Sequence, residues 1–174
     1  MTYDEIPLLG KYQRVLVTGP QRSGTQIAGR VIARILGYEF QNWKTWPAGL
    51  HGLMDFLAAE RVVWQNPSMV GAVPFLRSNS FRVAVVFVWR DLAEINASLK
   101  RIGWTAEEEE RFFLCMPDDN YTPSTIRKQH LWQTWEHRDA CLFTLPYEVL
   151  EPAPEWVERP DRGGWRSDQW RAEQ

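Results

Sequence analysis

RVLVTGPQRSGTQIAGRVIARILG, which runs from Arg14 to Gly37, contains the clearest structural pattern in this chain. Its first five residues form an apolar run that is too short for a helix and is typical of a buried strand. A turn-forming Gly19-Pro20 pair follows, and apolar side chains then recur at four-residue intervals, at Ile27, Val31 and Ile35. This period indicates a helix, which Gly37 is placed to end. The segment therefore predicts a strand, a loop and a helix in succession.

Strands and helices alternate along the rest of the chain. FRVAVVFVW, Phe81–Trp89, is the strongest strand candidate, because a continuous apolar run is typical of a strand buried on both faces. Asp91 can cap a following helix. The apolar stripe and end of that helix are Leu92, Ile95, Leu99, Ile102 and Gly103. The other expected elements are a loop at 41–52, strands at 61–65 and 141–145, and helices at 53–60, around 107–110 and at 123–139.

This alternation predicts an α/β fold with a mostly parallel sheet of about four to five strands flanked by helices. We expect a three-layer arrangement of the P-loop type. A length of 174 residues fits a single domain, 1–174, in which 151–174 forms a partly ordered tail rich in Pro, Trp and charge. In such sheets ligands bind beyond the carboxyl ends of the strands.

The composition excludes several classes of protein. A net charge of −2 argues against electrostatic binding of nucleic acid by the chain as a whole, so we expect no nucleic-acid partner. No apolar run reaches the roughly 20 residues that span a bilayer, and the first ten residues do not resemble a secretory signal. Cys115 and Cys141 suit neither a disulfide framework nor a zinc site. We therefore expect a cytoplasmic protein without a membrane partner, whose two thiols are buried.

The loop between the first strand and the first helix, GPQRSGT at Gly19–Thr25, has the composition of an anion-binding loop. Its backbone N–H groups can turn inward, and the helix N-terminus adds the positive end of a dipole. Arg22 supplies a forked positive charge, and Ser23 and Thr25 supply hydroxyl groups. The residues expected to bind a nucleotide phosphate or sulfate are Gly19, Gln21, Arg22, Ser23, Gly24, Thr25 and Gln26.

The loop departs from the usual kinase sequence G-x-x-x-x-G-K-[ST]. Thr25 and Gln26 follow Gly24, so the lysine that reaches the β- and γ-phosphates and the magnesium-binding hydroxyl are both missing. A standard ATP or GTP phosphotransferase retains both groups. The pattern therefore favours a phosphate- or sulfate-bearing ligand that needs no metal.

Arg22-Ser23-Gly24-Thr25 resembles the loop of the sulfotransferase family, in which a basic residue precedes S-G-T. A second match is the pair Arg90 and Ser98, an arginine at the end of a buried strand and a serine eight residues later. CLFTLPYEVL, from Cys141 to Leu150, is similar to the family's late strand and Y-E-D-L sequence, with Val149 departing from it. Arg162–Arg166, RGGWR, is more weakly similar to the family's terminal G-x-W-K.

The resemblance implies that the donor is 3′-phosphoadenosine 5′-phosphosulfate. In the family, the residues matched by Gly19–Thr25 hold the 5′-phosphosulfate, and those matched by Arg90 and Ser98 contact the 3′-phosphate. Arg22 would stabilise charge on the bridging oxygen as the sulfuryl group leaves. The chain is much shorter than typical members, which implies a reduced acceptor-binding region.

The catalytic base is the least defined part of this hypothesis. Many family members have a histidine after the strand matched by 61–65, where this chain has Gln65-Asn66-Pro67. The remaining candidates are His51, Asp55 and Glu60, of which we select His51. The transfer itself needs positioning, a base and positive charge near the leaving group, and we expect no metal.

Two other functions remain open. A divergent P-loop nucleotide or small-molecule kinase would have a similar opening segment, with Asp91 orienting a metal after the strand. A nucleotide-binding module without catalysis would explain the missing histidine. The sequence does not identify the acceptor, which could be a small molecule, a glycan or a peptide group. It does not give the oligomeric state either.

Overall fold

The fold is built on a parallel β-sheet. The computed structural model describes residues 1–46, 49–78, 82–101, 103, 128–129, 132–134 and 141–155. The sheet has five strands in the order β2-β3-β1-β4-β5, and every adjacent pair is parallel. These strands are β1 (Arg14–Thr18), β2 (Glu39–Asn42), β3 (Val62–Gln65), β4 (Val83–Trp89) and β5 (Leu142–Pro146). The α/β class and the predicted strand number are confirmed.

Helices connect and flank the strands. The α-helices are α1 (Thr25–Leu36), α2 (Leu50–Ala58), α3 (Val73–Ser78) and α4 (Leu92–Arg101). Short 3₁₀ helices are η1 (Tyr3–Lys11), η2 (Pro67–Ala72) and η3 (Tyr147–Leu150). As predicted, α1 ends at Gly37, which has a left-handed φ of 61° and donates its N–H to the Ala33 and Arg34 carbonyls.

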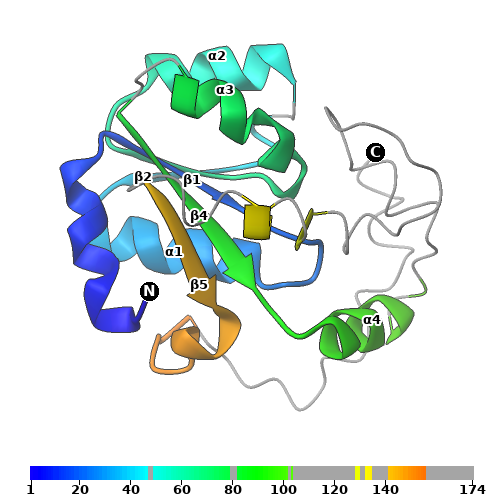
Figure 1. Cartoon of the computed structure of the whole chain (residues 1–174). Helices are drawn as coiled ribbons and strands as arrows, with labels where there is room; N and C mark the ends of the chain where they lie inside the picture. Colours follow the sequence, from blue (N-terminus) through cyan, green and yellow to red (C-terminus); the bar gives the residue numbers. More distant parts are fainter. Residues whose placement is uncertain are drawn as a thin grey trace.

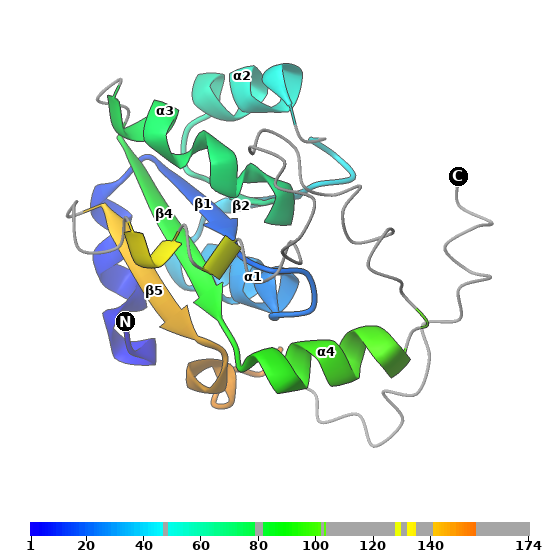
Figure 2. The same cartoon turned by 45° about the vertical axis from the view of Figure 1, so that its right-hand side comes forward.

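The two faces of the sheet carry separate apolar cores. On one face, Val15, Val17 and Val86 pack against α1, η1 and η3. On the other face, Leu16, Val85 and Phe87 pack against α2, η2 and α3. Figures 1 and 2 show α1 and the α2–α3 pair on opposite sides of the sheet. Because successive side chains of a strand point to opposite faces, strands buried on both sides read as the continuous apolar runs seen in β1 and β4.

Trp132 belongs to the second core. It is fully buried and stacks on Phe87 of β4, with ring centroids 4.9 Å apart. Its indole N–H donates to the Thr144 hydroxyl at 2.7 Å. By contrast, Cys141 is only half-buried, which corrects the expectation of a buried thiol there, and Cys115 lies outside the described residues.

Several elements differ from the prediction. Residues 41–52, expected as a loop, contain the end of β2 and the start of α2. The β2 sequence EFQN has no apolar run, because the strand lies at the sheet edge with partly exposed side chains. The helices η1, η2 and α3 were not expected. Of the predicted helix at 123–139, the structure describes 128–129 and 132–134, which are helical; the acidic run 107–110 and residues beyond 155 lie outside the described part.

The strand order sets where a ligand can enter. After β1 the chain moves outward to β2 and returns to β3, whereas after β4 it moves to β5 on the opposite side of β1. The connection that follows β1 therefore runs to one side of the sheet and the connection that follows β4 runs to the other side, so the loops after these two neighbouring strands diverge. In open parallel sheets this switch point is where a crevice opens at the carboxyl ends of the strands. The loop Gly19–Gly24 and Arg90 follow these two strands.

Candidate anion-binding site

The loop after β1 is tightly folded around Gly19 and Ser23. Gly19 has φ 143°, and a Cβ on it would lie 2.8 Å from the Val88 carbonyl oxygen, so β4 passes too close for any side chain. The Ser23 hydroxyl donates to the Pro20 carbonyl at 2.8 Å, and the Ser23 N–H points to the same oxygen at 3.3 Å. Ser23 therefore shapes the loop, whereas the sequence suggested that its hydroxyl would serve a ligand.

Gly24 starts α1 and leaves its first amides uncapped. As the N-cap residue it has φ 92° and no side chain to bond the N–H groups of the first turn. The Ala28 N–H bonds to the Gly24 carbonyl at 3.0 Å, so regular helical bonding begins there. The N–H groups of Thr25, Gln26 and Ile27 precede that first helical bond. Uncapped amides at the positive end of a helix dipole favour an anion.

Tyr147 of η3 packs directly against Gly24. A Cβ built on Gly24 would overlap the Cδ2 and Cε2 atoms of the Tyr147 ring. Tyr147 is buried in the core on the α1 face. The ring thus holds the loop from a segment more than 120 residues away in the sequence.

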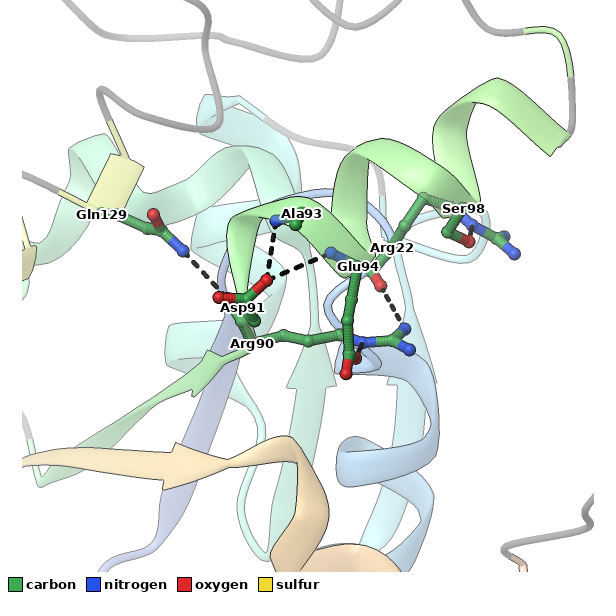
Figure 3. A network of polar contacts seen from close by, with 7 residues as sticks. All are labelled: Arg22, Arg90, Asp91, Ala93, Glu94, Ser98 and Gln129. Carbon is green, nitrogen blue, oxygen red and sulfur yellow. Dashed lines mark hydrogen bonds and ion pairs between the residues drawn. The ribbon is translucent and has the colours of Figure 1, made fainter.

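Arg22 and Ser98 form a direct contact between the first and second sequence motifs. The Arg22 Nε donates to the Ser98 hydroxyl at 3.1 Å. Figure 3 shows the Arg22 side chain extending from the loop to α4, where Ser98 faces it. Ser98 is buried, although Arg22 itself is an exposed residue with a left-handed φ of 64°. The structure therefore brings together two residues that are 76 positions apart.

Arg90 is held on three sides at the end of β4. Its Nη1 donates to the Arg22 carbonyl at 3.1 Å, and its Nε donates to the Glu94 carboxylate at 2.7 Å. Its guanidinium stacks on the Tyr147 ring, with Cζ 4.1 Å from the ring centroid. Only 15% of the Arg90 side chain is exposed. These contacts fix the orientation of the guanidinium next to the loop.

The start of α4 is capped as the sequence predicted. The Asp91 carboxylate accepts the N–H groups of Ala93 at 2.8 Å and of Glu94 at 3.3 Å. The Gln129 side chain donates to the Arg90 carbonyl at 3.1 Å, as Figure 3 shows. The turn from β4 into α4 is therefore fixed from both sides, which keeps Arg90 and Ser98 in register.

Gln65, for which the sequence predicts no role in the site, contacts the end of the loop through Thr25. Its Nε2 donates to the Thr25 hydroxyl at 2.9 Å, and both side chains are buried. The Thr25 oxygen accepts this bond and keeps its own hydrogen to donate. Among the described residues, none hydrogen-bonds to the Gln65 Oε1 atom. The sequence feature that could have pointed to Gln65 as a site residue is its position at the end of a predicted strand. The fold places this strand, β3, beside β1.

The remaining predicted residues lie apart from this network. Gln21 is half-buried and Gln26 is exposed on the first turn of α1. His51 is exposed at the start of α2, the helix that follows β2, and β3 lies between β2 and β1. Asp55 is exposed further along α2, and Glu60 precedes β3 at the opposite, amino-end edge of the sheet. Within the described part of the chain, His51 makes no hydrogen bond or ion pair with the loop.

The arrangement combines several groups that suit an anion. Two guanidinium groups, the Thr25 hydroxyl and the amides at the start of α1 are donor types that phosphate and sulfate esters prefer in proteins. Within the described ranges, no group of three or more His, Cys, Asp and Glu side chains is placed to hold a metal ion. The same ranges contain no helix that is long and apolar enough to cross a membrane.

Comparison with known proteins adds no family to this description. No protein-family model matches the chain, and no curated protein is significantly similar to it. The inference of a function therefore depends on the chemistry of the side chains around the loop.

Proposed function

We propose that this chain is a sulfotransferase-like enzyme with a P-loop-type fold. It would bind 3′-phosphoadenosine 5′-phosphosulfate and transfer the sulfuryl group to an acceptor hydroxyl or amine. The observation that carries the proposal is the contact of Arg22 with Ser98 and of Arg90 with the Arg22 carbonyl. These three residues belong to two separate sequence motifs, and they meet at the switch point of the sheet.

The two ends of the donor have separate sets of partners. The loop and the uncapped start of α1 suit the 5′-phosphosulfate, since each offers backbone amides. Arg90 and Ser98 suit the 3′-phosphate, because the guanidinium offers a planar fork of donors and the hydroxyl adds another. The ligand would then lie across the carboxyl ends of β1 and β4.

Arg22 is the residue to which we assign transition-state stabilisation. In the reaction the bond from sulfur to the bridging oxygen breaks while the acceptor oxygen or nitrogen bonds to sulfur. Negative charge develops on the departing phosphate of 3′,5′-ADP, and a base takes the acceptor proton. Because Arg22 is part of the loop, rotation about its side-chain bonds carries the guanidinium from Ser98 toward that oxygen. His51 stays the candidate base.

Calorimetric titration with 3′,5′-ADP, and separately with ATP plus magnesium, tests the donor class. We expect micromolar binding of 3′,5′-ADP that is unchanged when magnesium is removed by a chelator. A preference for ATP with magnesium would overturn the proposal in favour of a kinase. Binding of 3′,5′-ADP without sulfuryl transfer to any acceptor hydroxyl or amine would indicate a nucleotide-binding module.

Replacing Arg90 by alanine should weaken binding of 3′,5′-ADP by roughly 10- to 150-fold, because a charge-assisted hydrogen bond is typically worth about 1.5–3 kcal/mol. Binding of 5′-AMP, which lacks the 3′-phosphate, should change far less. Arg82→Ala is the matched control, since Arg82 is exposed and precedes β4 at the opposite edge of the sheet. An equal loss for both nucleotides would mean that Arg90 acts on the loop and does not read the 3′-phosphate.

A further inference from the structure

Glu94 is a carboxylate placed within the proposed anion site. Its Oε2 accepts the Arg90 Nε at 2.7 Å, and the two residues are four positions apart. The Glu94 side chain is 52% exposed, whereas that of Arg90 is 15% exposed. Figure 3 shows the carboxylate beside the guanidinium and on the same side of α4 as the Arg22 loop. A negative charge at this point works against the binding of a further anion.

The contacts of Arg90 leave one part of its guanidinium for a ligand. A guanidinium has five N–H donors. The Glu94 carboxylate uses the Nε donor and the Arg22 carbonyl uses one Nη1 donor, so five minus two leaves three. Among the described residues these three, one on Nη1 and two on Nη2, have no hydrogen-bond partner, and one of the two on Nη2 lies on the same side of the group as Nε. Tyr147 covers one face of the guanidinium.

This geometry determines how an anion can approach. A carboxylate or phosphate binds a guanidinium in a bidentate manner either along the Nε–Nη2 side or across the Nη1–Nη2 end. Glu94 occupies the Nε donor, so a bidentate contact along the Nε–Nη2 side is closed. An incoming phosphate is left with the Nη1–Nη2 end.

The charges of the site are also set by Glu94. Arg22 and Arg90 contribute two positive charges and Glu94 one negative charge, which gives a net charge of +1 for the three side chains. Without Glu94 the net charge would be +2, and an anion bound at Arg90 would bind more tightly. Because Glu94 is half-exposed, the repulsion is moderated by water and salt.

On the basis of the function proposed above, we propose that Glu94 is a specificity-determining residue of the 3′-phosphate site. It restricts Arg90 to an end-on contact and lowers its affinity for anions. The donor and the product 3′,5′-ADP both carry the 3′-phosphate, so Glu94 limits the affinity for each of them. A residue that merely held Arg90 in place would act in the opposite direction, since its loss would weaken binding.

The test measures binding of 3′,5′-ADP and 5′-AMP to the wild type and to Glu94→Gln by calorimetry. The glutamine keeps an oxygen that can accept the hydrogen bond from the Arg90 Nε, so the orientation of the guanidinium is retained and only the negative charge is lost. We expect binding of 3′,5′-ADP to tighten about fivefold, the size of an exposed charge interaction, and binding of 5′-AMP to stay within about twofold. The gain should shrink at 1 M salt, where screening acts within about 3 Å.

Glu60→Gln is the matched control, because it removes the same charge from an exposed position at the amino-end edge of the sheet. It should leave both affinities unchanged. Equal or weaker binding of 3′,5′-ADP by Glu94→Gln, with normal discrimination between the two nucleotides by the wild type, would overturn the role of Glu94 alone. If the wild type does not discriminate between them, the proposed donor is wrong and the role of Glu94 is wrong with it.

Discussion

Arg22→Ala is expected to lower the rate of sulfuryl transfer by roughly 100- to 1,000-fold, the loss typical of removing one transition-state donor. The chain should stay folded, because the Arg22 side chain is exposed and belongs to neither core. Its left-handed φ of 64° is equally unfavourable for alanine, so the backbone gains no new strain.

The rate is measured as release of 3′,5′-ADP from the donor in the presence of acceptors that carry hydroxyl or amine groups. A thermal melt of the same sample verifies folding. Arg30→Ala is the control, because Arg30 is another exposed arginine, on α1. Full activity in Arg22→Ala would remove Arg22 from the mechanism, and an equal loss in Arg30→Ala would point to a non-specific effect of charge.

Gly24→Ala is expected to destabilise the protein by about 3 kcal/mol, since the left-handed φ costs about 1 kcal/mol and overpacking about 2 kcal/mol. The new Cβ would overlap the Tyr147 ring, which is buried and cannot move away freely. For a chain of this size the loss lowers Tm by roughly 6–12 °C. Binding of 3′,5′-ADP should be lost as well, because the clash acts on the loop and on the ring that supports Arg90.

Gly49→Ala is the control that distinguishes the cost of a left-handed φ from the cost of the overlap with Tyr147. Gly49 has φ 114°, and no described atom lies within 4 Å of a Cβ built there. This variant should lose only about 1 kcal/mol. The double variant Gly24→Ala with Tyr147→Ala should lose less than the sum of the two single changes, because the overlap has been removed. Additive losses, or equal losses for Gly24→Ala and Gly49→Ala, would show that Tyr147 does not restrict the loop.

Much of the local structure could be predicted because its causes are local. The strand, loop and helix of Arg14–Gly37 follow from the change in apolar period and from a glycine placed to end the helix. The cap at Asp91 follows from the chemistry of one side chain and the next two amides. Strand β2 could not be found this way, since an edge strand needs no apolar run.

The sequence alone determined which segments form the strand–loop–helix unit and that Arg22, Arg90 and Ser98 have the chemistry of an anion site. Only the tertiary structure decided that these residues touch. Parallel strands are joined by long crossover connections, so the local sequence does not show which strands become neighbours. The strand order places β4 beside β1, and this brings Arg22 to Ser98. The same packing puts Tyr147 under Gly24 and Gln65 behind Thr25, contacts that no periodicity or spacing encodes.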